Sequence, residues 1–354
     1  MNVRVLAAFA VVFQLIAQQP RFKAIWEPVN YKADLMLFDV HFATEDAGWV
    51  VGGSTEMAGG LILHTTDAGR TWEVQYGDAQ SSDRAVQALR FIDGKTGWAT
   101  QDSPLSARLL HTVDGQNWDQ VGEINSHYVD LSFTSPTHGV YTDGTEIYTT
   151  ADAGHKWQPV AKCAVQTEIE GLTKNVECQF HALSFPSAQT GYAAAGSIYL
   201  KDRFFIFKTT DGGASWVSST ISADGGAEAS AFTSDKTGFV RTGYPDSGRL
   251  YRTTDGGASW TGIGASPGLS IRFVDQEVGW SFHYSKLSFT TNGTRWTSRT
   301  FKFPVSVTTF SLPSRRRAYV VGQHGMIYRY SVVPIDYTAK GMIDAPMMPP
   351  SDTK

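Results

Sequence analysis

Residues 209–216 read TTDGGASW, and residues 253–260 repeat the same eight letters. Four looser copies lie at 65–72, 112–118, 150–157 and 290–296. All six contain a threonine, an Asp or Asn two positions later, a glycine and then a tryptophan. Alternating apolar residues lead into the copies, so each copy is predicted to be a hairpin turn between two antiparallel strands.

We call these six segments the Asp turns. Asp and Asn side chains accept hydrogen bonds from turn N–H groups, and glycine readily adopts positive φ. The tryptophan begins the next strand, where its ring can pack against a neighbour. The Asp-Gly and Asn-Gly pairs at 114–115 and 292–293 are those preferred in two-residue hairpins. We therefore expect structural roles for Asp67, Gly69, Trp72, Asp114, Trp118, Asp152, Gly154, Trp157, Asp211, Gly213, Trp216, Asp255, Gly257, Trp260, Asn292 and Trp296.

A second string lies upstream of each Asp turn and occurs seven times. An apolar residue is followed six positions later by a small residue and then, usually, an aromatic one, as in FATEDAGW at 42–49. The lead positions are 42, 91, 133, 185, 232, 273 and 312, at intervals of 39 to 52 residues. Four short antiparallel strands in about 45 residues are typical of one β-propeller blade.

The seventh unit ends after its third strand and has no Asp turn. Residues 24–29 (AIWEPV) resemble the strand after an Asp-turn tryptophan, such as TWEV at 71–74. We expect this N-terminal strand to supply the missing outer strand and close the ring, which removes free edges. The predicted fold is therefore all-β, a seven-bladed β-propeller of four-stranded antiparallel blades closed by an N-terminal strand.

Composition and chain ends set the domain organisation. The 354 residues are 42% hydrophobic and 12% aromatic, with a formal charge of −4, which argues against nucleic-acid binding through bulk charge. Residues 1–17 combine a cationic start with a 13-residue apolar stretch and predict a signal peptide; a buried strand or an uncleaved anchor are the alternatives. We expect export to a periplasmic or extracellular compartment, a propeller at 24–333 and a flexible tail at 334–354. No later stretch is long enough for a transmembrane helix.

The chain has two cysteines, Cys163 and Cys178. An even count in an exported chain predicts one disulfide, closing the segment 161–180, although two reduced thiols remain the alternative.

The turn pattern resembles the Asp-box, or bacterial neuraminidase repeat, found in sialidases, xyloglucan-cleaving glycosidases and sortilin-type receptors. Together the two strings look most like the photosystem II stability and assembly factor family, over about residues 24–333. That resemblance implies an assembly chaperone that binds newly made reaction-centre polypeptide at the membrane, partly through an arginine-bearing surface. Arginines near a blade turn are Arg315, Arg316 and Arg317, which we take as candidate binding residues, with a solvated charge cluster as the alternative.

Catalytic patterns are weak in this sequence, so the question of an enzyme stays open and a binder is favoured. Glycosidases need two carboxylates about 5–10 Å apart, and the loop candidates are Glu56, Asp102, Glu168, Glu170, Asp224, Glu228 and Asp246. The histidines lack metal-ligand spacing such as His-x-x-x-His. We expect no catalytic residues, no metal and no cofactor.

Long, irregular loops between second and third strands and between blades are predicted to share one end of the ring. Binding residues concentrate on such loops; they include the segments 196–203 and 161–180. Our candidate contacts there are Arg108, Tyr199, Lys201, Asp202, Arg203, Tyr244, Asp246, Arg249, His283 and Tyr284.

The sequence thus favours an exported, monomeric, non-enzymatic propeller that binds a protein partner, which could be a membrane protein. The alternative is an extracellular glycan-active protein, either a sialidase-like or other glycoside hydrolase or a glycan-binding propeller.

Overall fold

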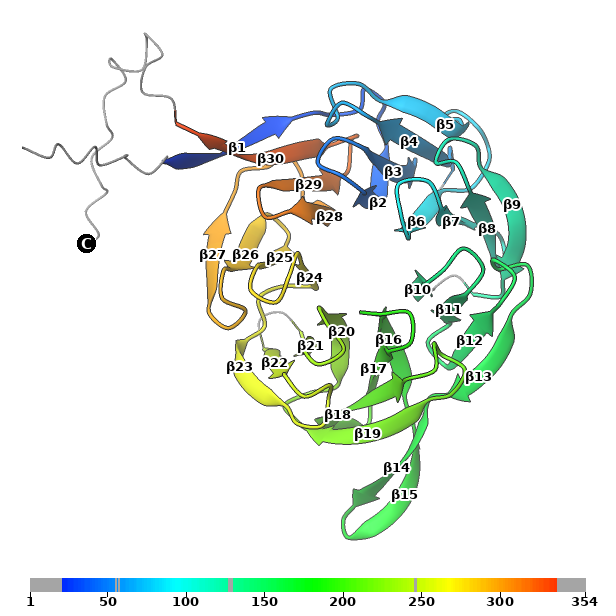
Figure 1. Cartoon of the computed structure of the whole chain (residues 1–354), viewed down its shortest axis with the longest axis vertical. Helices are drawn as coiled ribbons and strands as arrows, with labels where there is room; N and C mark the ends of the chain where they lie inside the picture. Colours follow the sequence, from blue (N-terminus) through cyan, green and yellow to red (C-terminus); the bar gives the residue numbers. More distant parts are fainter. Residues whose placement is uncertain (1–20, 55, 57, 127–129, 245–246, 336–354) are drawn as a thin grey trace, which may run out of the picture.

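The computed structural model describes residues 21–54, 56, 58–126, 130–244 and 247–335. Within these residues the chain forms strands and turns without a helix, and seven four-stranded antiparallel sheets stand radially around one axis (Figure 1). The predicted seven-bladed all-β propeller is confirmed. The predicted signal peptide at 1–17 and residues 336–354 of the predicted tail lie outside the described residues.

In each blade the first strand lies innermost and the fourth outermost (Figure 1). Blade 1 contains β2 (Met36–Phe42), β3 (Gly48–Gly53), β4 (Leu61–Thr65) and β5 (Glu73–Gly77). Blade 2 contains β6 (Val86–Phe91), β7 (Gly97–Asp102), β8 (Ala107–Thr112) and β9 (Asp119–Ile124). Blade 3 contains β10 (Asp130–Phe133), β11 (Gly139–Thr142), β12 (Glu146–Thr150) and β13 (Gln158–Lys162). Blade 4 contains β16 (Gln179–Ser184), β17 (Gly191–Ser197), β18 (Leu200–Thr209) and β19 (Val217–Ser222). Blade 5 contains β20 (Ala227–Phe232), β21 (Gly238–Thr242), β22 (Arg249–Thr253) and β23 (Thr261–Ala265). Blade 6 contains β24 (Ser270–Phe273), β25 (Gly279–His283), β26 (Lys286–Thr290) and β27 (Trp296–Thr300).

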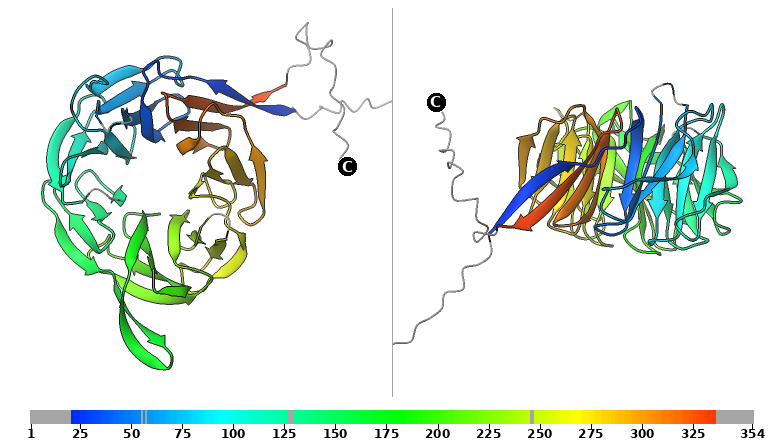
Figure 2. Two further views of the ribbon diagram at one scale, coloured as in Figure 1. Left: turned by 180° about the vertical axis from the view of Figure 1, so that it is seen from behind. Right: turned by 90° about the horizontal axis from the view of Figure 1, so that it is seen from above.

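Blade 7 joins the two ends of the described chain. Its strands are β28 (Val307–Ser314), β29 (Arg317–Gly322) and β30 (Ile327–Pro334), and β1 (Phe22–Pro28) completes it. β1 pairs antiparallel with β30 over seven residues, from Phe22 opposite Pro334 to Pro28 opposite Tyr328. The N-terminal strand therefore closes the ring as predicted. In the other blades an Asp turn joins the third and fourth strands. At the corresponding end of blade 7, β1 and β30 continue as a two-stranded ribbon that projects beyond the ring (Figure 2).

The second repeated string encodes a packing unit between neighbouring blades. In blade 1 the Phe42 ring lies directly over Gly48, where a Cβ atom would come within 2.4 Å of the ring. The other side of that ring stacks on Tyr319 of blade 7, with centroids 3.4 Å apart, and Trp72 of the Asp turn meets it edge-on at 6.3 Å. Only glycine leaves room for the ring, which explains the constant spacing from aromatic to small residue.

The same unit recurs around the ring. Stacked pairs join blade 1 to 2, 2 to 3, 4 to 5 and 5 to 6 through Trp49–Phe91, Trp98–Phe133, Tyr192–Phe232 and Phe239–Phe273. Residues of the same string also meet between blades 3 and 4, where Phe185 packs in the cluster of Val140, and between blades 6 and 7, where Leu312 packs in the cluster of Trp280.

The cysteine segment forms a hairpin that the sequence did not predict. β14 (Ala164–Ile169) pairs with β15 (Leu172–Glu177) outside the ring, between blades 3 and 4 (Figure 1). Cys163 and Cys178 form a disulfide at its base, and both are buried. Arg203 of β18 fastens the hairpin by donating to the Thr167 hydroxyl at 2.9 Å and the Glu168 carbonyl at 2.7 Å.

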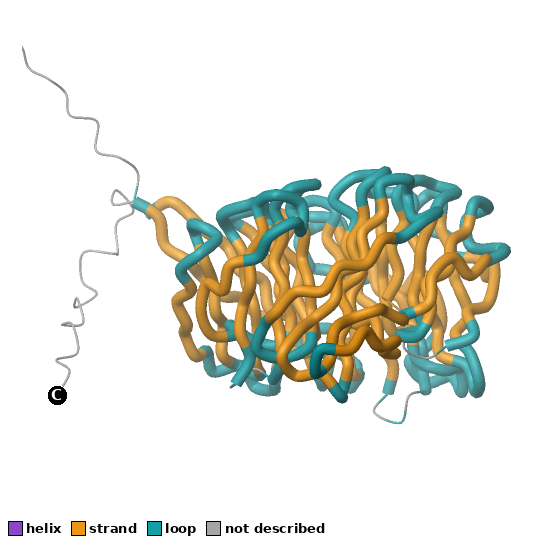
Figure 3. The backbone as a smooth tube through the Cα atoms, turned by 90° about the horizontal axis from the view of Figure 1, so that it is seen from below, coloured by secondary structure: helices purple, strands orange, loops and turns teal. Residues whose placement is uncertain are grey.

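Turns and loops gather on the two flat faces of the disc (Figure 3). One face, which we call the Asp-turn face, contains the Asp turns and the turns between first and second strands. The other, the loop face, contains the connections between second and third strands and those between blades.

Candidate functional site

The Asp turns use their own polar groups internally. In blade 4 the Thr209 hydroxyl donates to Asp211 at 2.6 Å and accepts from the Gly213 N–H at 2.9 Å, while Asp211 accepts from the Ser215 N–H at 3.0 Å. In blade 5 the hydroxyl and N–H of Ser259 lower the pKa of Asp255 to about 2. These carboxylates are held ionised as acceptors for the turn, which is a structural role.

The three candidate arginines on the Asp-turn face also contact the propeller itself. Arg315 forms ion pairs with Asp275 at 2.6 Å and Glu277 at 2.8 Å. Arg316 lies over the ring of Phe22, and Arg317 contacts Glu45 and the Ser331 hydroxyl. Carboxylates therefore balance the charges of Arg315 and Arg317, whereas Arg316 is exposed and contacts only a ring.

The loop face exposes large apolar side chains over three neighbouring blades. Tyr199 and Tyr244 are each 82% exposed, Ile198 is 73% exposed and Tyr284 is 62% exposed. They stand at the tips of turns between second and third strands in blades 4, 5 and 6, and Leu269 between blades 5 and 6 adds to them. Exposed aromatic tips on a rigid scaffold are typical of protein-binding surfaces.

A groove of about 530 Å³ opens on this face between blades 4 and 5. Ile198 and Lys201 form one wall, Tyr244 and Ser247 the other, and His181 of β16 contributes from the innermost strand. Its volume falls within the range of ligand-binding clefts.

The floor of the groove is backbone without side chains. It contains Gly196, Gly225, Gly226 and Gly243. A Cβ atom at Gly196 would lie 3.1 Å from the Cα of Gly226, so glycine lets the two blades approach closely here. Bare backbone lets a bound chain come close to the propeller.

Charged groups of both signs line the groove. Asp224 pairs with Arg249 at 2.5 Å, whereas Glu228 and Lys201 form no ion pair within the described part of the chain. Arg241 lies buried beneath, donating to the carbonyl of Gly243. Burial lowers the pKa of Arg241, and the charge of Glu228 opposes that effect. The groove thus presents a carboxylate, Glu228, and an ammonium group, Lys201, at separate points of its lining.

The sequence-based candidates divide into three groups. Lys201 and Tyr244 line the groove, Arg249 pairs with Asp224 of its lining, and Tyr199 is next to Ile198 in the turn beside it. Asp202 and Arg203 pair with each other beside the hairpin. Arg108, in blade 2, and His283 with Tyr284, in blade 6, lie on other blades. Asp246 lies outside the described residues.

Sequence reasoning missed the groove's innermost and lowest residues. Gln179 and His181 belong to the innermost strand β16, and neither they nor the glycines of the floor were among the candidate contacts. The segment expected as a loop at 196–203 is instead a tight turn, with Ser197 opposite Leu200 and Ile198 and Tyr199 at its tip. The Gly225-Gly226 pair was the one available signal.

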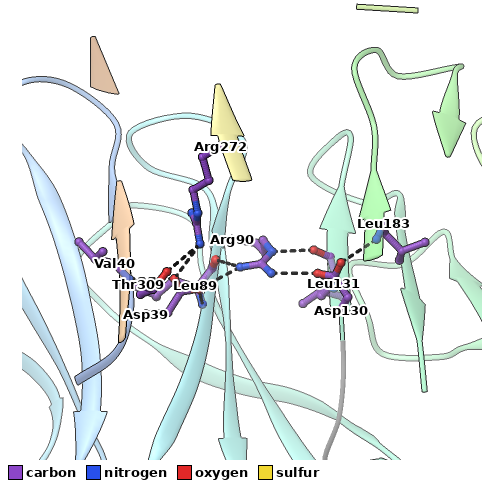
Figure 4. Close-up of polar contacts among 9 residues, drawn as sticks. All are labelled: Asp39, Val40, Leu89, Arg90, Asp130, Leu131, Leu183, Arg272 and Thr309. Carbon is purple, nitrogen blue, oxygen red and sulfur yellow. Dashed lines mark hydrogen bonds and ion pairs between the residues drawn. The ribbon is translucent and has the colours of Figure 1, made fainter. Parts of the chain in front are cut away.

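A separate polar network ties the innermost strands together (Figure 4). Asp39 accepts from Arg90 at 2.9 Å, from the Leu89 N–H at 3.1 Å and from Arg272 at 3.4 Å. Arg90 also pairs with Asp130 at 3.0 Å, and Asp130 accepts from the Leu183 N–H at 2.7 Å.

Arg272 also donates to Thr309, so the network joins six of the seven blades, from blade 6 through blades 7, 1, 2 and 3 to blade 4. Because the groups satisfy one another, we assign this network to holding the ring together.

Across the described residues there is no group of three or more His, Cys, Asp or Glu side chains arranged to hold a metal ion. The same part of the chain contains no helix long and apolar enough to cross a bilayer.

The chain is similar to proteins of photosystem II assembly. Residues 19–184, just under half of the chain, match the family model described as photosynthesis system II assembly factor YCF48. A rice protein (Oryza sativa subsp. japonica), photosystem II stability/assembly factor HCF136, chloroplastic, is 26% identical over 182 residues. That match covers 48% of this chain and 41% of the rice protein.

Solved structures share the fold at low identity. YCF48 bound to D1 peptide superposes with a TM-score of 0.62 at 20% identity, covering 86% of this chain and 96% of that one. YCF48 from Cyanidioschyzon merolae superposes with a TM-score of 0.57 at 18% identity, and the match covers 86% of this chain and 98% of that one. A virginiamycin B lyase from Staphylococcus aureus, an enzyme, superposes with a TM-score of 0.56 at 10% identity. That match covers 88% of this chain and 100% of the lyase chain. The propeller alone therefore does not distinguish a binder from an enzyme.

Proposed function

We propose that this propeller binds a polypeptide segment of a membrane-protein partner on its loop face, as an assembly factor of the photosystem II type. The observation that carries the proposal is the glycine-floored groove between blades 4 and 5, flanked by the exposed side chains of Ile198, Tyr199 and Tyr244. An extended chain could approach the bare floor while its side chains contact the aromatic rim.

The similarity to assembly factors supports a protein partner over a small molecule. The solved relative named as YCF48 bound to D1 peptide indicates the kind of ligand to try first. In this chain the arginines at 315–317 are occupied by internal contacts, so we place the docking surface on the opposite face.

Peptide binding tests this proposal directly. A set of fluorescent peptides tiled along the segments of D1 outside the membrane, here called the tiled peptide set, would be titrated with the purified chain and binding followed by anisotropy. We expect one or a few neighbouring peptides to bind. The double substitution Ile198→Ser/Tyr244→Ser should weaken binding at least tenfold, since buried aromatic anchors dominate interface energy.

The control changes equally exposed apolar residues elsewhere. Val113→Ser/Val217→Ser alters two side chains that are 70% and 73% exposed, away from the groove. The affinity of this variant for the binding peptides should match that of the unaltered chain. Equal loss in both double variants, or no loss in the groove variant, contradicts the assignment of the groove.

We also propose export and a monomeric state. The disulfide between buried Cys163 and Cys178 supports an oxidising compartment such as the periplasm or the extracellular space. N-terminal sequencing of the mature protein should begin shortly after Ala17 if residues 1–17 are a cleaved signal, and size-exclusion chromatography with light scattering should give the monomer mass.

A glycan-active protein is the second candidate, favoured by one observation. Asp224 and Glu228, two of the candidate carboxylates, line the same groove, and glycosidases use such pairs. The tight ion pair with Arg249 engages Asp224 in the structure. Hydrolysis of sialosides or β-glucans that is lost in Asp224→Asn and Glu228→Gln would favour this alternative; we expect no hydrolysis.

A further inference from the structure

Charge is distributed unevenly around the ring. From 278 to 335 the sequence has eight Lys and Arg residues and no Asp or Glu. Because the whole chain carries −4 and this stretch +8, the rest carries −12. The stretch forms most of blades 6 and 7, so one side of the disc is strongly basic within an acidic protein.

Four of these eight cations lie in blade 7, where each contacts a carboxylate or an aromatic ring of the propeller: Arg315, Arg316, Arg317 and Arg329. The other four form no ion pair within the described residues and are all exposed: Lys286, Arg295, Arg299 and Lys302. We call these four the blade 6 rim.

The blade 6 rim follows the outermost strand of its blade. β27 (Trp296–Thr300) lies on the outside of the ring (Figure 1). Arg295 precedes this strand and Lys302 follows it, so the rim extends about 20 Å. Arg299 is opposite Leu287 and lies over the Phe289 ring at 5.6 Å, while Lys286 is opposite Thr300. Because successive pairs alternate between the two faces of a sheet, Lys286 and Arg299 lie on opposite faces of the blade, so the four cations are spread along its outer edge and do not converge on one point.

One exposed aromatic residue accompanies the rim at its loop-face end. Tyr284 precedes Lys286 by two positions and is 62% exposed. The Phe301 N–H donates to the Ser285 carbonyl, so the backbone next to Lys302 lies beside this turn, while the rings of Phe301 and Phe303 pack against Trp26. A tyrosine among cations is typical of membrane-interface segments.

The outer strands on the other side of the ring have the opposite charge. β5 begins with Glu73, and β9 contains Asp119 and Glu123, all exposed. An anionic surface would attract blade 6 and repel blades 1 and 2, which fixes the orientation of the disc.

We propose that the blade 6 rim docks on the headgroups of an anionic lipid bilayer. A compact anionic ligand would need convergent cations, whereas cations spread along a convex edge suit an extended surface of mobile charges. This site is separate from the groove between blades 4 and 5 and goes beyond peptide binding: it would hold the propeller beside the membrane in one orientation.

Vesicle co-sedimentation of the purified full chain tests the proposal. Vesicles of phosphatidylcholine alone are compared with vesicles containing 30% phosphatidylglycerol. The protein should sediment with the anionic vesicles only, and 0.5 M NaCl should release it, since exposed charges are screened. The variant Lys286→Gln/Arg299→Gln/Lys302→Gln should lower the partition coefficient on the order of 100-fold, because each basic residue near the membrane contributes severalfold.

A matched variant separates this site from net charge. Lys95→Gln/Lys156→Gln/Lys236→Gln removes the same charge from exposed turns of blades 2, 3 and 5 and should bind vesicles like the unaltered chain. Thermal melts of both variants check the fold. Equal loss in both variants, or no binding of the unaltered chain to anionic vesicles, overturns the proposal. Rim-dependent binding to polyglutamate without vesicle binding also overturns it and indicates an acidic protein partner.

Discussion

At the scale of single residues, each Asp turn depends on a buried hydroxyl at its entrance. Thr209 is 1% exposed, and its oxygen bonds both Asp211 and the Gly213 N–H. The sequence predicted the part played by Asp and Gly, because turn chemistry is local. It gave the threonine only a general local role, and the structure identifies the hydroxyl as the group that satisfies the buried glycine N–H.

Replacing this hydroxyl should destabilise the protein measurably. Thr209→Val keeps the shape of the side chain but leaves a buried N–H without an acceptor, so we expect the free energy of unfolding to fall by about 1–3 kcal/mol. Thr209→Ser keeps the hydroxyl and should cost less. Urea denaturation of both variants measures the difference; equal losses would contradict this role for the hydroxyl.

Acid sensitivity should depend on one histidine of the innermost strand of blade 1. Burial lowers the pKa of His41 to about 4, with nearby Arg272 and Arg90 acting in the same direction and Asp39 against it. Unfolding returns the pKa to about 6.5, so the unfolded state binds more protons between pH 6.5 and 4. Stability is therefore full above pH 6.5 and is lost as the pH falls towards 4.

The test compares the unaltered chain with His41→Phe, which retains a ring to stack on Phe91. Between pH 7 and pH 4 the unaltered chain should lose about 2–3 kcal/mol more unfolding free energy than the variant. Parallel pH profiles of the two proteins would show that His41 does not carry the effect.

At the scale of elements, most of the fold was predictable and most of the site was not. The number of blades could be predicted because the upstream string recurs seven times, and the closing strand because the seventh unit lacks its fourth strand and residues 24–29 resemble one. The β14–β15 hairpin occurs once, so no repeat could reveal it. The groove was equally hidden, because Gln179 and Gly226 come from different blades and meet only once the ring has closed.

The hairpin should depend on its disulfide. Cys163→Ser/Cys178→Ser opens a 15-residue loop and should lower the free energy of unfolding by about 3 kcal/mol in the loop-entropy treatment. Circular dichroism should still report the β-propeller, since the hairpin lies outside the ring. A collapse of the whole fold would instead make the hairpin part of the core.

At the scale of the whole molecule, ring closure couples the first described strand to the last blade. Trp26 of β1 packs among Trp280, Phe301, Phe303 and Tyr330, with ring centroids 5.2–5.9 Å apart. These rings come from blades 6 and 7, so a single side chain holds the closing strand against two sheets.

Shortening that side chain should weaken the closure. Trp26→Ala should lower the free energy of unfolding by about 3 kcal/mol. Trp26→Phe retains an aromatic ring and should lower it by clearly less. Hydrogen exchange should speed up first in β1 and β30 if the ring opens at this blade. Uniform acceleration around the ring would contradict a local closure.

The two proposed sites lie on different parts of the disc, and the proposed function rests on the assignment of peptide binding to the loop face. Site-specific photo-crosslinking tests it most directly. A photo-crosslinking amino acid would replace Tyr244 beside the groove or Arg316 on the Asp-turn face, and each protein would be irradiated with the tiled peptide set. We predict crosslinks to a binding peptide from position 244 and none from position 316. Crosslinks from position 316 alone would contradict the assignment.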